Sequence, residues 1–291
     1  MRMLLNPRVG ILIWLLAGTV MSALAGEPQL QRVKYHSNSL EADREYWLYL
    51  PKGYDPDSAK RWPVLMFLHG GGERGNQLEL VLRHGPIMEV VIKRRDLPFI
   101  IIAPQMPEMS KEEQQRREER RRQARQDRTP RDGPDRQSLV RIPSGKEPRW
   151  GSLGPPEGWS KMEDDLLRMI DDTLKEHRAD ADRVYLTGLS YGGFGTWYMA
   201  THHPDRWAAV APICGAGQND QVHLIKNLPV WLIQGGRDEV VRAEWTLATA
   251  DALDKSGGNV RVTVHEDLQH DSWSRAYGGQ DLYDWFLSHH R

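Results

Sequence analysis

The chain has 291 residues, enough for one large α/β domain with a buried core. Its formal net charge is -1, so no strong basic field indicates nucleic acid as a partner. Cys214 is the only cysteine, which excludes an internal disulfide.

The first 25 residues have the pattern of a secretory signal peptide. The basic residues Arg2 and Arg8 precede the apolar run "VGILIWLLAG". "ALA" at 23–25 fits a small-residue cleavage site. An uncleaved membrane anchor is the alternative, although the run is shorter than the roughly 20 residues that a span needs. We therefore expect an exported mature chain of residues 26–291, periplasmic or secreted, with no stable membrane insertion after cleavage.

Apolar runs predict strands at 44–50, 63–70, 99–104, 183–188, 207–213, 229–236 and 260–266. The first and last alternate with polar residues, whereas the others are almost continuously apolar, which is typical of parallel strands covered on both faces.

Helical patterns lie between these strands, at 159–177, from Ser190 to Pro204, at 243–256 and at 280–289. Ser160 and Glu163 have the spacing of a capping box at the first of these helices. Strands that alternate with helices predict one α/β domain with a doubly wound, mostly parallel sheet and helices on both faces.

One segment, at about 107–158, interrupts this alternation. It begins with the highly charged "KEEQQRREERRRQARQDR" at 111–128, where Glu–Arg pairs at i,i+4 support a solvated helix, and continues as a loop rich in Pro and Gly. Acidic residues among the basic ones argue against a basic binding arm. We expect a charged, mobile surface insertion.

"YLTGLSYGGFGTW" (185–197) contains a G-x-S-x-G motif centred on Ser190. An apolar strand pattern precedes it and a helical pattern follows, and this strand–turn–helix context gives the motif its meaning. Flanking glycines allow a sharp turn that exposes the serine hydroxyl. The motif predicts that Ser190 is a nucleophile; the alternative is a small residue in a tight turn.

A serine nucleophile needs a base, which in turn needs an orienting carboxylate. With this motif the acid and the histidine follow in that chain order. Asp238 lies in the loop after the strand at 229–236, and His270 lies in the loop after the strand at 260–266. Both loops leave the carboxyl ends of strands, where ligands bind in open α/β sheets.

The glycine-rich "LHGGGERGN" (68–76) follows another buried strand and is the candidate for an oxyanion hole. In this arrangement the hole combines the amide after the nucleophile, here Tyr191, with an amide of the early loop, here Gly71 or Gly72.

The blocks "FLHGGGERGN", "IIAPQ", "RVYLTGLSYGGFGTWYMA", "PDRWAAVAPICG", "PVWLIQGGRDEVV" and "HDSWSRAYGGQDLYDWFL" resemble one family over residues 32–106 and 159–290. This family is the α/β-hydrolase esterases of the predicted-peptidase and carboxylesterase group, related to polyhydroxybutyrate depolymerases and feruloyl-type esterases. The resemblance implies the α/β-hydrolase fold and places Ser190, Asp238 and His270 at the family's triad positions. Tyr191 stands where many members have Met, and the insertion replaces a short loop.

Trp273, three residues after His270, is a candidate wall of an aromatic or sugar-binding cleft, with packing as the alternative. The insertion leaves open whether Trp150 or Trp159 is equivalent to the family's tryptophan. We interpret Cys214 as a buried structural cysteine, and we expect no metal site, because adjacent His202 and His203 cannot face one ion from a helix.

Together these features predict an exported serine hydrolase of small-molecule or polysaccharide-linked carboxylic esters that needs no cofactor and binds no nucleic acid. Two alternatives remain: a serine peptidase acting on short peptides, and a catalytically silent hydrolase fold that binds polysaccharide. The sequence does not indicate the oligomeric state.

Overall fold

The structure is a computed structural model that describes residues 26–111, 114–115, 118–119, 122 and 158–291. The predicted signal peptide, Trp150 and most of the charged insertion lie outside the described residues. None of the helices within the described ranges has the length and apolar character needed to cross a membrane.

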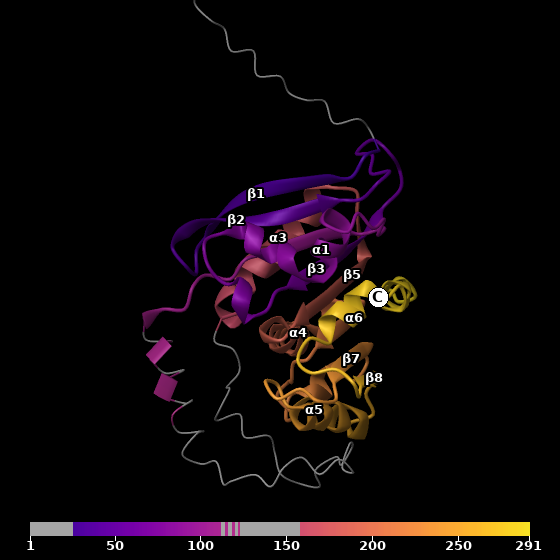
Figure 1. The fold of residues 1–291 in the computed structure, drawn as a ribbon. Helices are drawn as coiled ribbons and strands as arrows, with labels where there is room; N and C mark the ends of the chain where they lie inside the picture. The colour runs from indigo at the N-terminus through magenta and orange to yellow at the C-terminus, as the bar shows by residue number, and fades with distance from the viewer. Residues whose placement is uncertain (1–25, 112–113, 116–117, 120–121, 123–157) are drawn as a thin grey trace, which may run out of the picture.

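One eight-stranded sheet forms the centre of the molecule, with the strand order β1-β2-β4-β3-β5-β6-β7-β8 (Figure 1). Strands β3 to β8 are mutually parallel, while β1 and β2 pair antiparallel at one edge. The strands are Gln29–Ser37 (β1), Ala42–Leu50 (β2), Trp62–Leu68 (β3), Ile100–Pro104 (β4), Ala179–Leu189 (β5), Ala209–Ile213 (β6), Val230–Gly235 (β7) and Val260–His265 (β8).

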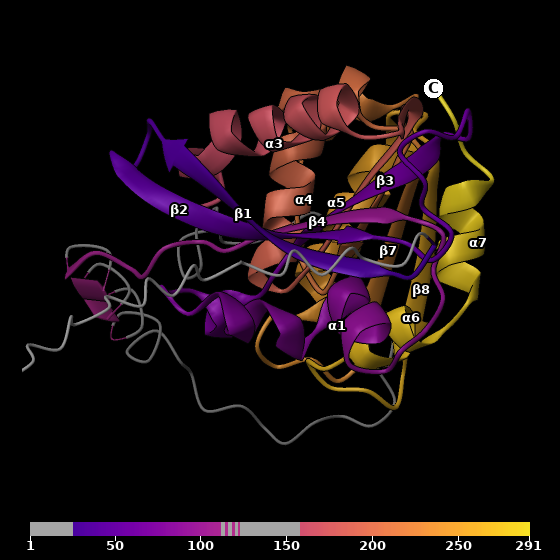
Figure 2. The same cartoon turned by 90° about the horizontal axis from the view of Figure 1, so that it is seen from above.

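Helices cover both faces of this sheet, so the predicted doubly wound α/β-hydrolase fold is confirmed (Figure 2). On one face lie α3 (Glu163–Glu176), α4 (Tyr191–His202) and α5 (Ala243–Lys255), and on the other lie α1 (Gly85–Val91), α6 (Trp273–Gly278) and α7 (Asp281–Leu287). Each layer encloses its own buried apolar cluster, because the continuously apolar strands present side chains to both faces.

Two details of the sequence reading differ from the structure. The apolar runs do not predict strand β1, because its residues are mostly half-buried or exposed at the sheet edge and give only a weak apolar pattern. The capping box at Ser160 is wrong: Ser160 begins a short 3-10 helix, and α3 starts at Glu163 without a side-chain cap. Instead, Glu163 accepts hydrogen bonds across the surface from Tyr198 Oη and His203 Nε2.

The start of α4 packs against the carboxyl ends of β3 and β6 through glycines. A Cβ on Gly192 would lie 1.9 Å from the carbonyl oxygen of Leu68, and a Cβ on Gly193 would lie 2.5 Å from that of Ile213. Only residues without a side chain allow the helix and the strands to approach so closely.

We expect Gly192→Ala to lower the free energy of unfolding by about 3 kcal/mol or more, because the new methyl group meets backbone that cannot move independently. Gly278→Ala is the matched control, since no heavy atom lies within 4 Å of its added Cβ. Urea unfolding followed by circular dichroism measures both variants. Equal stabilities would contradict the close packing of α4 on β3.

Candidate active site

Ser190 occupies the turn between β5 and α4 with a strained backbone. Its φ is 51° and its ψ is -113°, a region that non-glycine residues rarely adopt and that costs of the order of 1–3 kcal/mol. Two hydrogen bonds hold it there: the Ser190 N–H donates to Ile213 O at 2.9 Å, and the Phe194 N–H donates to Ser190 O at 3.1 Å. The surrounding structure thus holds Ser190 in a backbone conformation that is unfavourable for a serine.

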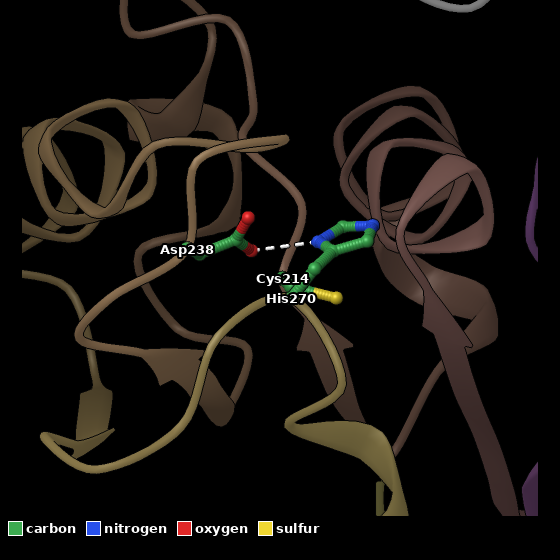
Figure 3. Close-up of side chains that lie close together, drawn as sticks. All are labelled: Cys214, Asp238 and His270. Carbon is green, nitrogen blue, oxygen red and sulfur yellow. Dashed lines mark hydrogen bonds and ion pairs between the residues drawn. The ribbon is translucent and has the colours of Figure 1, made fainter.

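The side chain of Ser190 is the first of three that form a continuous hydrogen-bonded chain. Its Oγ lies 2.9 Å from His270 Nε2, and His270 Nδ1 lies 2.7 Å from Asp238 Oδ2. Figure 3 shows the imidazole of His270 with the carboxylate of Asp238 on its Nδ1 side. Because Asp238 follows β7 and His270 follows β8, the sequence-predicted residues come together from three separate loops.

Asp238 is buried, and backbone and side-chain donors satisfy its carboxylate. Oδ1 accepts the N–H groups of Val240 and Val241 at 2.8 and 2.9 Å. Oδ2 accepts a hydrogen bond from Gln234 Nε2 at 3.2 Å in addition to the one from His270. With both oxygens held, the carboxylate orients His270 so that Nδ1 carries the proton and Nε2 accepts from the serine hydroxyl.

The glycine loop after β3 lies against the residue that follows Ser190. A Cβ on Gly71 would lie 3.9 Å from Tyr191 Cβ, so the loop and the start of α4 are in contact. Gly71 and Gly72 open a 3-10 helix, η1 (Gly71–Glu73), and the first N–H groups of a helix have no partner within it. This is the arrangement in which backbone amides of both segments can face one oxyanion.

His69 anchors the base of this loop, a role that the sequence reading did not assign. The side chain is fully buried; Nδ1–H donates to Gly70 O at 2.6 Å, and Nε2 accepts the Met106 N–H at 2.9 Å. Burial lowers the pKa of His69 to about 4, so the imidazole is neutral near pH 7. One ring thereby fixes the loop after β3 to the segment after β4.

Gln105 is the second residue of this kind. Its buried amide Nε2 donates to the carbonyl of Glu73 in the glycine loop at 2.9 Å and to that of Gln77, just after the loop, at 2.7 Å. The backbone N–H of Gly75 also donates to Met106 O at 2.9 Å. The strings "LHGGGERGN" and "IIAPQ" contain both residues, yet the pairing of the two loops that gives them a role appears only in three dimensions.

Cys214 lies beneath the His270–Asp238 pair (Figure 3). Single ligand atoms of Cys214, Asp238 and His270 all lie within 4.8 Å of one another, which is also the arrangement of a small metal site. The thiol is fully buried, and desolvation raises its pKa far above the ordinary value. Both ring nitrogens of His270 already have hydrogen-bond partners, Asp238 and Ser190, so the geometry is that of a hydrogen-bonded relay.

The three tryptophans considered from the sequence have different positions. Trp273 is half-buried, and its ring stands edge-on to that of His270 with centroids 5.1 Å apart. Trp159 is fully buried in the core beneath α4, against Gly195 and the ring of His69. Trp150 lies outside the described residues. Of these three tryptophans, only Trp273 contacts one of the candidate catalytic residues at the carboxyl ends of the strands.

Comparisons with known proteins find several proteins that are similar to this chain. The model of the Prolyl oligopeptidase family matches residues 160–231, which include β5, Ser190 and α4. Poly(3-hydroxyalkanoate) depolymerase C of Paucimonas lemoignei is 48% identical over 50 residues, which are 17% of this chain and 12% of that one. The crystal structure of a thermostable esterase is 26% identical with a TM-score of 0.64, covering 90% of this chain and 63% of that one.

The chain has the α/β-hydrolase fold and is similar to esterases with that fold. A further α/β-hydrolase structure, a ferulic acid esterase from Anaeromyces mucronatus solved with ferulic acid, is similar in fold, with a TM-score of 0.55 at 16% identity over 90% of each chain. This α/β-hydrolase spans less than two thirds of the length of the first relatives it matches.

The neutral, buried state of His69 predicts a specific pH dependence of stability in this α/β-hydrolase. The unfolded pKa of about 6.5 exceeds the folded value of about 4, so the unfolded chain binds the proton more readily. Stability is therefore complete above about pH 6.5 and falls as the pH drops toward 4, by up to about 3 kcal/mol from this residue.

His69→Gln keeps an acceptor for the Met106 N–H but cannot titrate. Urea unfolding of both proteins at pH 7.5 and pH 5 should show a smaller acid-induced loss in the variant. The same loss in both proteins would mean that His69 is accessible to protons in the folded state.

Proposed function

We propose that this protein is a serine hydrolase that cleaves carboxylic esters through a covalent acyl-enzyme. The observation that carries the proposal is the unbroken chain from Ser190 Oγ through His270 to the buried Asp238, with distances of 2.9 and 2.7 Å. A histidine held in this way takes the serine proton as the hydroxyl attacks a carbonyl carbon. The strained turn at Ser190 supports the same role.

The steps follow from these positions. Ser190 Oγ bonds to the carbonyl carbon while its proton passes to His270 Nε2, and Asp238 stabilises the resulting imidazolium. The N–H of Tyr191, with that of Gly71 or Gly72, binds the oxyanion. His270 then protonates the leaving alcohol, and afterwards it activates a water that hydrolyses the acyl-enzyme and releases the acid.

Substrate class and location are the finer parts of this proposal. The named activity of the ferulic acid esterase and the position of Trp273 beside His270 favour acyl groups linked to plant polysaccharide. Export follows from the signal-peptide pattern at residues 1–25, so the enzyme acts in the periplasm or outside the cell. The charged insertion at about 107–158 is proposed as a surface element of the same domain.

Ser190→Ala should lower kcat/KM for p-nitrophenyl acetate and methyl ferulate roughly 10,000-fold or more, because no other group supplies the acyl acceptor. Ser58→Ala, at a half-buried bend between β2 and β3, is the control and should retain the wild-type rate. Equal rates in wild type and Ser190→Ala would make Ser190 a turn residue and leave the silent, polysaccharide-binding fold as the better interpretation.

Peptide-bond hydrolysis by the same residues is the second candidate, because the matching family model is that of the Prolyl oligopeptidase family. The two functions separate on substrates with one common acyl group, a p-nitrophenyl ester and a p-nitroanilide of the same short peptide. We expect the enzyme to cleave the ester. We expect it to cleave the anilide slowly, because p-nitroaniline is the poorer leaving group and an esterase does not compensate for it. Efficient release of p-nitroaniline, lost in Ser190→Ala, would favour the peptidase.

A further inference from the structure

Gln234 places a fully buried amide near the end of β7, next to the candidate acid. Its Nε2 lies 3.0 Å from Val241 O, 3.2 Å from Gly235 O and 3.2 Å from Asp238 Oδ2. All three atoms are acceptors, so the amide nitrogen and not the amide oxygen must face them. The two hydrogens of the amide are thus shared among three acceptors, one of which is the carboxylate.

The oxygen of the same amide gains nothing from this position. Gln234 Oε1 is buried and has no hydrogen-bond partner within the part of the chain that the structure describes. An unpaired buried acceptor costs about 1–3 kcal/mol, and an apolar side chain of the same length would avoid that cost. What the site obtains from Gln234 is therefore its pair of N–H donors.

The carboxylate of Asp238 does not need Gln234 to keep its position. Two backbone N–H groups, those of Val240 and Val241, hold its Oδ1 at 2.8 and 2.9 Å. Gln234 instead reaches Oδ2, the oxygen that also accepts from His270 Nδ1 at 2.7 Å. A donor to a carboxylate stabilises its negative charge, so less of that charge is available to a second donor on the same oxygen.

We infer that Gln234 is a positioning residue that acts on His270 through Asp238: by sharing Oδ2, it limits how firmly the carboxylate holds a proton on the imidazole. This inference rests on the proposed hydrolase function and deepens it at the same site. In the proposed reaction His270 must take the proton of Ser190 and then give it up to the leaving alcohol. A moderated carboxylate keeps His270 Nε2 free of a proton further toward acidic pH in the resting enzyme.

Several other ionisable groups surround the Asp238–His270 pair. Cys214 lies beneath it (Figure 3), and desolvation raises the pKa of its thiol far above the ordinary value, so the thiol is neutral. His84 contacts Trp273, which in turn contacts His270. The charged residues nearby on the two loops and on α6 are all exposed: Arg237, Glu239, Asp267, Asp271 and Arg275. A change of Gln234 alone leaves every one of these groups in place.

The test removes the amide donors and follows the pH dependence of the reaction. Gln234→Met keeps the approximate length of the side chain without any N–H group, and Gln234→Leu serves the same purpose if the first variant does not fold. Gln105→Met is the matched control, because Gln105 is also a buried amide but donates to the carbonyls of Glu73 and Gln77. Circular dichroism confirms the fold of each protein, and kcat/KM for p-nitrophenyl acetate is measured from pH 4.5 to pH 9.

Without the amide, the carboxylate should hold the imidazole proton more firmly. We expect the midpoint of the acidic limb in Gln234→Met to move upward by about half a pH unit or more, which lowers kcat/KM roughly threefold or more below that limb. Gln105→Met should lower kcat/KM by a similar factor at every pH and keep the wild-type midpoint, because it loosens only the oxyanion loop.

Two kinds of result would overturn the inference. A loss at every pH without movement of the midpoint in Gln234→Met would leave Gln234 with a packing role alone. A downward movement would show that Asp238 has lost its hold on His270, and an equal upward movement in Gln105→Met would show that the effect is not specific to Gln234.

A second measurement does not depend on turnover. The proton between His270 Nδ1 and Asp238 Oδ2 should give a far-downfield signal in the proton NMR spectrum, and a stronger hydrogen bond moves that signal further downfield. We expect this movement in Gln234→Met and not in Gln105→Met. An unmoved signal contradicts the inference even where the enzyme is active. A protein that shows the movement but neither hydrolyses esters nor reacts with a fluorophosphonate would instead refute the proposed function and keep the coupling of Gln234 to His270.

Discussion

The close approach of α4 to the carboxyl ends of β3 and β6 is the constraint on which the site depends. The gap is so narrow that Gly192 and Gly193 have no room for a Cβ, and the chain must turn sharply between β5 and α4. Ser190 is held in that turn with a φ of 51°, which presents its hydroxyl toward His270. The strain at one residue is thus maintained by the packing of a whole helix against the sheet.

The other loops of the site leave the carboxyl ends of neighbouring strands on the same side of the molecule as Ser190. The loop that carries His270 crosses directly over the end of β7: a Cβ on Gly235 would lie 1.9 Å from Gln269 O, and the Arg237 N–H donates to Leu268 O at 2.9 Å. This crossing brings His270 to Asp238 although 32 positions separate them. On the other side of Ser190, His69 and Gln105 fix the glycine loop to the segment after β4.

Local sequence patterns predict those parts of this arrangement that depend only on the order of segments along the chain. Continuous apolar runs identified the parallel strands, and the G-x-S-x-G motif with its later acid and histidine named three residues that the fold brings into hydrogen-bonding distance. The edge strand β1 gave too weak a pattern, and the pairing of Glu163 with Tyr198 and His203 is a tertiary contact that overrides its local capping signature.

The residues that sequence reasoning missed share one property: their roles arise between segments. His69 accepts a hydrogen bond from the Met106 N–H, and Gln105 donates to the carbonyls of Glu73 and Gln77. No periodicity predicts which polar residue of a glycine-rich loop turns inward. Such residues set the position of the loop.

The most direct test of the central claim is to identify the residue that becomes covalently modified. The purified protein would be treated with a fluorophosphonate, digested, and analysed by peptide mass spectrometry. The account predicts a single adduct on the peptide that contains Ser190, formed faster than on free serine and absent after denaturation before treatment. An adduct on another residue, or a folded protein that does not react, would contradict the assignment of Ser190 as the nucleophile.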